Sequence, residues 1–144
     1  VWLSREDQIN AVTAISGSGP AYVFHMAETL AGSGEALGLE PAIAKRLAYQ
    51  TVSGAGAMLD AGVADPDVDA AQLRRDVTSP GGTTEAALGI LASETGLGDL
   101  MRRTPSAAFQ FLTLPQLAHS QPLSPSRAIL PRRWCLRVLA LCHE

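Results

Sequence analysis

Residues 77–84, Val-Thr-Ser-Pro-Gly-Gly-Thr-Thr, combine residue types that could bind a small anion. The proline fixes φ and the two glycines lack a Cβ, so the backbone can turn sharply here. Thr83 and Thr84 stand directly before an apolar stretch with helical spacing, where a new helix would begin. The first N–H groups of a helix have no partner within it, and the helix dipole places partial positive charge there. The pattern therefore predicts either an ordinary helix-capping turn or a site for a carboxylate or phosphate oxygen.

The composition favours a helical protein with no nucleic-acid or membrane partner. Of the 144 residues, 47% are hydrophobic but only 5% are aromatic, so the core must be built from alanine and aliphatic side chains, which suits packed helices. The net charge of −3 gives no electrostatic reason to expect nucleic acid. No apolar run approaches the roughly 18–20 residues of a membrane span, and no signal peptide is visible. Cys135 and Cys142 lack metal-site spacing, which is typical of reduced thiols in a cytoplasmic protein.

Helical periodicity and helix-boundary residues place several helices in the first 104 residues. Alternating β-branched runs and Asn-Gly hairpins are missing from the sequence, so the expected fold class is all-α. Pro20 is expected in the first turn of one helix and Glu40-Pro41 at the start of another. The expected helices cover residues 7–16, 20–38, 41–62, 71–76 and 84–93, with a last one beginning at 97–103.

The sequence changes character near Thr104. Residues 1–104 hold all 13 glycines, whereas residues 105–144 hold none and contain five of the nine prolines. We expect Pro105 to stop the last helix, which gives a helical domain over 1–104 and an atypical, irregular tail over 105–144. Three explanations for the tail are open: a disordered segment, a divergent extension, or translation in a shifted reading frame. Its glycine-free, Ser/Pro/Arg/Leu-rich composition favours the last.

Two segments carry a resemblance to a known family. The run Thr13-Ala14-Ile15-Ser16-Gly17-Ser18-Gly19-Pro20-Ala21-Tyr22, residues 73–91, and the spacing between them resemble the C-terminal dimerisation domain of pyrroline-5-carboxylate reductase. The resemblance covers about residues 5–104. It implies a helical bundle of the 6-phosphogluconate-dehydrogenase-like type, which interleaves with its counterpart in a homodimer, and such dimers often join into decamers. A helical domain from another Rossmann-linked dehydrogenase is the alternative, and the run at 77–84 argues against it.

The resemblance also implies an activity and a missing part. The family reduces 1-pyrroline-5-carboxylate to L-proline with NADPH or NADH, held mainly by an N-terminal Rossmann domain. No G-x-G-x-x-G after a strand occurs in this chain, so it is expected to be a fragment that is inactive alone. The competing hypothesis is a helical dimerisation module without a catalytic role.

Site residues follow from the same resemblance. The amides of Ser79, Gly82 and Thr83 are implied to bind the substrate carboxylate, and Thr84 Oγ is implied to bond the ring nitrogen as the catalytic contact. Catalysis would then rest on orientation and fixed dipoles. Ser16 and Ser18 are candidates for contacting the cofactor, and a helix break with Ser18 as N-cap is the competing interpretation. No metal site is expected.

Overall fold

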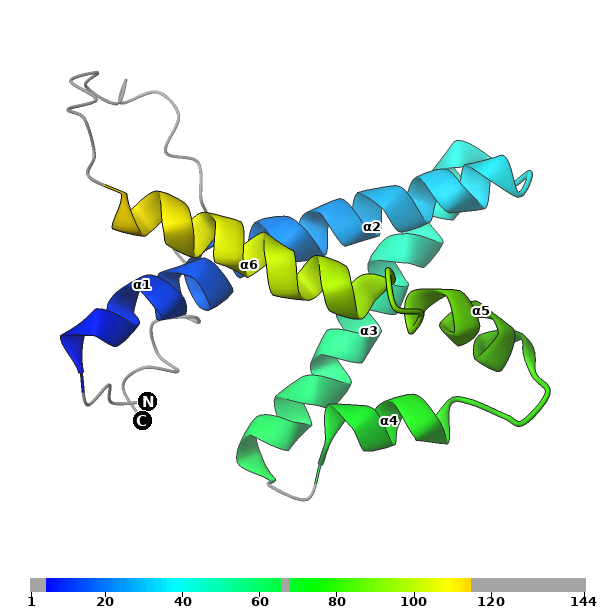
Figure 1. Cartoon of the computed structure of the whole chain (residues 1–144). Helices are drawn as coiled ribbons and strands as arrows, with labels where there is room; N and C mark the ends of the chain where they lie inside the picture. The colour runs from blue at the N-terminus through cyan, green and yellow to red at the C-terminus, as the bar shows by residue number, and fades with distance from the viewer. Residues whose placement is uncertain (1–4, 66–67, 115–144) are drawn as a thin grey trace. The chain divides into compact units, whose positions relative to one another are not determined.

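All secondary structure within the described residues, 5–65 and 68–114, is helical in this computed structural model (Figure 1). The all-α prediction is therefore confirmed for this part of the chain. The elements are a 3-10 turn Glu6–Gln8, α1 Ile9–Val12, a π-helical turn Thr13–Gly17, α2 Gly19–Ala36, α3 Pro41–Ala64, α4 Ala70–Asp76, α5 Thr83–Leu91 and α6 Leu97–Thr113. None of the described helices is both long and apolar enough to span a membrane.

The chain forms two compact units, which are described separately. One unit runs from Pro20 to Arg103 and holds α3, α4 and α5 with most of α2 and the first part of α6. The other contains residues up to Gly19 and from Thr104 onward. The run at 77–84 lies in the first unit, whereas Ser16 and Ser18 lie in the second.

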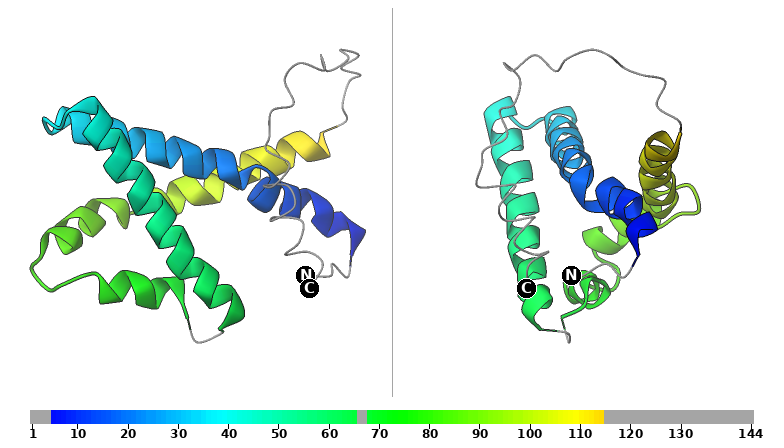
Figure 2. Two further views of the ribbon diagram at one scale, coloured as in Figure 1. Left: turned by 180° about the vertical axis from the view of Figure 1, so that it is seen from behind. Right: turned by 90° about the vertical axis from the view of Figure 1, so that its left-hand side faces the viewer.

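A glycine-ended turn separates α2 from α3. Gly38 has φ +93°, a left-handed conformation in which a side chain is strained. The Leu39 N–H donates to the Gly34 carbonyl (3.1 Å) and the Gly38 N–H donates to the Glu35 carbonyl (2.9 Å). These two bonds form a Schellman motif, which satisfies carbonyls at the end of α2. The chain then turns back into α3 (Figure 2).

The predicted start of α3 is confirmed. Glu40 is the N-cap, and its carboxylate accepts a hydrogen bond from the Ile43 N–H (3.3 Å). Pro41 occupies the first turn, where its missing N–H costs nothing. A Cβ added to Gly34 would lie 3.1 Å from Ala44 Cβ. This short distance shows that α2 and α3 approach closely near the turn.

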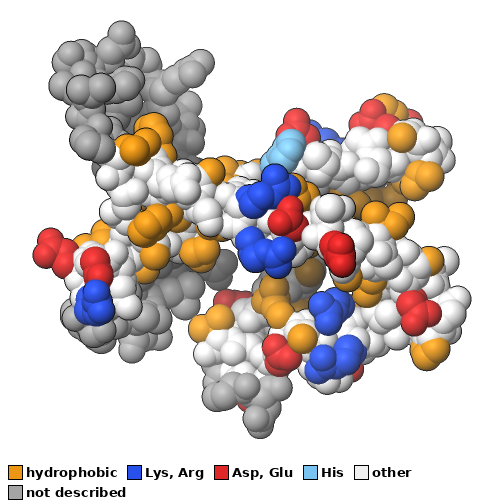
Figure 3. Space-filling model, in the orientation of Figure 1, with side chains coloured by type: hydrophobic (Ala, Val, Ile, Leu, Met, Phe, Trp, Pro, Cys, Tyr) orange, Lys and Arg blue, Asp and Glu red, His pale blue; other side chains and the backbone are white. Residues whose placement is uncertain are grey.

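Only small apolar side chains are buried among the described residues. The set consists of Ala14, Ala27, Ala31, Ala44 and Ala48. Large apolar side chains are exposed on each of the three long described helices, with Phe24 in α2 63% exposed, Leu47 in α3 53% and Phe111 in α6 65%. Figure 3 shows hydrophobic side chains in orange across the visible face of several helices. The part of the chain that the structure describes therefore buries little of its apolar surface.

The predicted boundary between helical segments at Ser16–Pro20 is observed, since the π turn ends at Gly17 and α2 begins at Gly19, but the prediction of Ser18 as N-cap is wrong. The Ser18 N–H donates to the Thr13 carbonyl (2.9 Å), a π-type bond that spans five residues. Ser18 itself has helical φ and ψ (−89°, −22°), whereas an N-cap residue is extended, so Ser18 is not an N-cap. The π turn accommodates one extra residue and lets the helical path continue into α2.

The expected stop at Pro105 is also wrong. Helix α6 continues through Pro105 to Thr113. Proline lacks the N–H that would bond the carbonyl four residues earlier, but this loss can bend a helix without ending it. Residues 105–113 are therefore helical, and 115–144 lie outside the described residues. The boundary at 104 and the three explanations for the tail stay predictions.

Candidate functional site

The candidate loop begins where α4 ends. The Thr78 N–H donates to the Arg75 carbonyl (2.9 Å), and Thr78 Oγ1 donates to the Arg74 carbonyl (2.6 Å). These bonds satisfy two carbonyls that the last helical turn would otherwise leave without partners. The threonine thus ends α4 and fixes the direction in which the loop leaves it.

Residues 79–82 form a type II β-turn. The Gly82 N–H donates to the Ser79 carbonyl (3.0 Å), and Gly81 has φ +71°. Proline suits the second position of this turn and glycine the third, where φ is positive. A Cβ on Gly82 would lie 3.0 Å from the Ser79 oxygen, so the fourth position also favours glycine. The sequence Ser-Pro-Gly-Gly therefore matches the local backbone at each position.

Helix α5 starts directly after this turn. Gly82 is an extended N-cap (φ −86°, ψ 171°) without a side-chain cap bond, and the Ala86 N–H donates to its carbonyl (3.2 Å). Thr83 and Thr84 thus occupy the first two helical positions, where N–H groups have no partner within the helix. Both residues are exposed. The predicted helix start one residue later, at Thr84, is close to the observed one.

Glu85 adds a contact that we did not predict. The Gly81 N–H donates to Glu85 Oε2 at 2.7 Å. Glu85 is at the third helical position and reaches back over the helix N-terminus as in a capping box, but it bonds the residue before the N-cap, and Gly82 has no side chain to return the bond. The Gly81 and Gly82 amides are therefore both engaged inside the loop. The Gly82 amide, one of the three predicted carboxylate donors, bonds Ser79 in this geometry.

The predicted site residues fall into two groups. Ser79, Gly82, Thr83 and Thr84 lie together in the loop and the first turn of α5. Ser16 lies in the π turn, where its Oγ donates to the Val12 carbonyl (2.9 Å) and is half-buried. Ser18 follows that turn. Both serines belong to the other compact unit.

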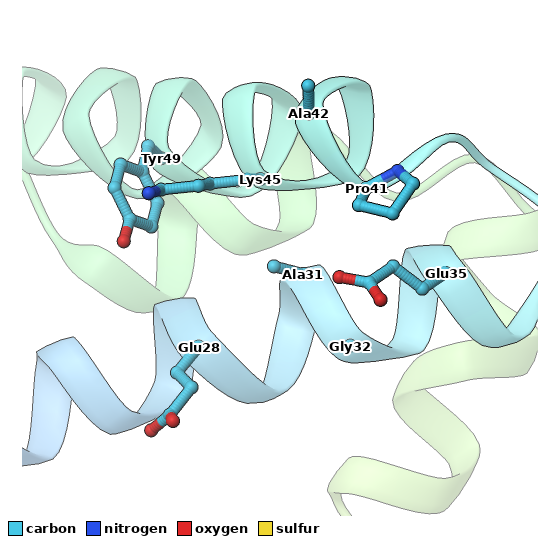
Figure 4. Close-up of a pocket in the computed structure, with 8 residues that line it drawn as sticks. All are labelled: Glu28, Ala31, Gly32, Glu35, Pro41, Ala42, Lys45 and Tyr49. Carbon is cyan, nitrogen blue, oxygen red and sulfur yellow. The ribbon is translucent and has the colours of Figure 1, made fainter.

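Neither of two hollows in the 20–103 unit is lined by a predicted site residue. One is a groove of about 520 Å³ between α2 and α3, where Lys45 Nζ lies 5.5 Å from the centre of the Tyr49 ring (Figure 4). The other, of about 780 Å³, lies among α4, α5 and the start of α6 and includes Leu88, Leu91 and Met101. Among the described residues, no group of histidine, cysteine, aspartate and glutamate could hold a metal ion.

Comparison with known proteins identifies one family. Residues 6–112 match the family model described as pyrroline-5-carboxylate reductase dimerisation. The chain is 51% identical over 88 residues to the pyrroline-5-carboxylate reductase of Pseudomonas aeruginosa, covering 61% of this chain and 31% of that protein. It is 42% identical over 108 residues to the reductase of Glycine max, covering 75% of this chain and 38% of that protein.

Solved structures agree with these sequence matches. A pyrroline-5-carboxylate reductase from Coxiella burnetii has 43% identity and a TM-score of 0.69, over 77% of this chain and 39% of that one. The Plasmodium falciparum pyrroline carboxylate reductase with NADP bound has 33% identity and a TM-score of 0.65, over 74% of this chain and 39% of that one. The chain thus spans about a third of the length of these relatives.

Proposed function

Because the chain belongs to the pyrroline-5-carboxylate reductase dimerisation family, we propose that it supplies the substrate loop and subunit interface of an enzyme that reduces 1-pyrroline-5-carboxylate to L-proline. The match over residues 6–112 is the observation that carries this proposal. It includes the whole loop at 77–84.

The loop suits a cyclic imine that carries a carboxylate. The N–H groups at the start of α5 and the positive end of its dipole favour an anion without a lysine or arginine. In this proposal the amides of Ser79 and Thr83 bind the carboxylate, while the Gly82 amide holds the turn. Thr84 Oγ bonds the ring nitrogen and orients the ring for hydride transfer. The substrate nitrogen carries its own proton, so fixed dipoles and orientation supply the catalysis.

The cofactor proposed for the whole enzyme is NADPH or NADH. The Plasmodium falciparum relative holds NADP, which supports a nicotinamide cofactor in this family. We place most of its contacts in an N-terminal Rossmann domain and keep Ser16 and Ser18 as candidate contacts from this chain. We also propose that the whole enzyme works in the cytoplasm.

Homodimer formation explains the exposed apolar surface. Only alanines are buried among the described residues, whereas leucine, isoleucine and phenylalanine side chains on several helices are open to solvent. So many exposed large apolar side chains are typical of a chain with an interaction face, and the matched family model is one of dimerisation. A second copy of the chain would cover these faces, and a decamer would require such dimers to join further.

A fusion protein tests the proposed function. The part of the Pseudomonas aeruginosa reductase that lies before its matched segment is joined to residue 6 of this chain, and NADPH oxidation is followed with 1-pyrroline-5-carboxylate. Turnover by the fusion, and its absence in the 144-residue chain alone, is the expected result. A folded, dimeric fusion without turnover would favour the second candidate, a dimerisation module with no catalytic role, which is supported by the matched family model being one of dimerisation.

A further inference from the structure

We propose that Glu85 is a positioning residue that holds the substrate loop in its binding conformation before the substrate arrives. The proposal rests on the proposed function, because it assigns a role within the same loop. Glu85 does not touch the substrate in this account. It acts through the Gly81 amide, which donates to Glu85 Oε2 at 2.7 Å.

This contact decides which amides remain for a ligand. Pro80 has no N–H, the Gly81 N–H is bonded to Glu85, and the Gly82 N–H is bonded to the Ser79 carbonyl. The amides proposed to bind a ligand are then that of Ser79, at the first position of the turn, and those of Thr83 and Thr84, at the start of α5. Glu85 therefore satisfies the one turn amide that would otherwise compete with them for an anion.

The contact also reduces the ordering that binding would require. Gly81 has φ +71°, and a loop with two adjacent glycines has many alternative conformations when it is free. A charge-assisted bond between Gly81 and the first turn of α5 restricts them in advance. When the loop is already ordered, ligand binding does not have to supply the free energy that ordering the loop would cost.

The charge of Glu85 opposes this effect only weakly. A carboxylate in the first turn of a helix is favourable toward the helix dipole but repels a substrate carboxylate nearby. Glu85 is exposed, so solvent and salt screen the repulsion. The affinity gained from an ordered loop should therefore exceed the affinity lost to repulsion. Removal of the Glu85 carboxylate is thus expected to raise the KM for 1-pyrroline-5-carboxylate.

The test uses the fusion protein and two substitutions at one position. Glu85→Ala is expected to raise the KM for 1-pyrroline-5-carboxylate by about five- to tenfold, the size expected for loss of one solvent-exposed hydrogen bond, with kcat and the KM for NADPH nearly unchanged. Glu85→Gln keeps an acceptor oxygen and is expected to stay within about twofold of wild type. Glu94→Ala removes a carboxylate in the same unit and serves as the matched control.

Three outcomes separate the possible failures. An unchanged KM in Glu85→Ala, with an active wild-type fusion, overturns the role of Glu85 and leaves the proposed function intact. A lower KM overturns it too, because it means that the Glu85 carboxylate competes with the substrate. A folded wild-type fusion without turnover overturns the proposed function and the role of Glu85 with it.

A second measurement tests the contact without catalysis. Amide hydrogen exchange at Gly81, followed by NMR in the 144-residue chain, should be about fivefold faster or more in Glu85→Ala than in wild type. Exchange should stay slow in Glu85→Gln and in Glu94→Ala. Equal exchange in all four proteins would refute the contact on which the inference depends.

Discussion

Gly81 is the position where one added methyl group should disturb the loop most. Its φ is +71°, and a Cβ added there would meet no atom within 4 Å. The effect of Gly81→Ala is therefore conformational strain and not a steric clash. A non-glycine residue in the left-handed region costs about 1–2 kcal/mol, which would change the equilibrium between the native and a relaxed loop by about 5- to 30-fold.

The matched control is Gly89→Ala, in the interior of α5. The added Cβ would again meet nothing within 4 Å, but Gly89 has no positive φ. Alanine in a helix interior is favoured over glycine by about 0.8–1 kcal/mol. The same chemical change should therefore lower the free energy of unfolding at position 81 and raise it at position 89.

Chemical denaturation followed by circular dichroism checks both signs. Protein concentration must be held fixed, since the stability of an oligomer depends on it. If the loop relaxes in Gly81→Ala, less stability is lost. Relaxation would, however, break the bond from the Gly82 N–H to the Ser79 carbonyl and raise the KM of the fusion for 1-pyrroline-5-carboxylate. Unchanged stability together with an unchanged KM in Gly81→Ala would refute the left-handed turn.

Further substitutions test the catalytic contact and the last helix. In the fusion protein, Thr84→Ala should lower kcat by about tenfold or more, the size expected for loss of one orienting hydrogen bond. Thr84→Ser keeps the hydroxyl and is the matched control. A kcat in Thr84→Ala equal to that of wild type would exclude the contact with the ring nitrogen. Pro105→Ala should restore a helical hydrogen bond in α6 and raise the free energy of unfolding by about 2–2.6 kcal/mol, which is the helix penalty of proline less its effect on the unfolded chain. Destabilisation by Pro105→Ala would show that the proline fits a bend that the fold needs.

Local backbone chemistry explains which elements could be predicted from the sequence. Glu40-Pro41 and Gly38 carry helix-boundary signals that need no tertiary contact, and the structure confirms the helix start and end that they indicate. The turn at Ser79–Gly82 is similar, because proline and glycine restrict φ residue by residue.

Features that depend on competing hydrogen bonds were harder to predict. The Ser-Gly-rich run before Pro20 resembles a helix break, but a π-type bond from Ser18 to Thr13 bridges it. Pro105 removes one helical bond, yet the bonds around it maintain α6. The assignment of the Gly82 amide to Ser79, and of the Gly81 amide to Glu85, depends on the turn geometry and not on residue type alone.

Turnover by the fusion protein tests the central claim most directly. With the preceding part of the Pseudomonas aeruginosa reductase attached, the chain should oxidise NADPH only when 1-pyrroline-5-carboxylate is present, and the rate should fall in Thr84→Ala. The intact Pseudomonas aeruginosa enzyme, assayed alongside, shows that substrate and cofactor are competent. A folded, dimeric fusion that oxidises no NADPH under those conditions would contradict the account.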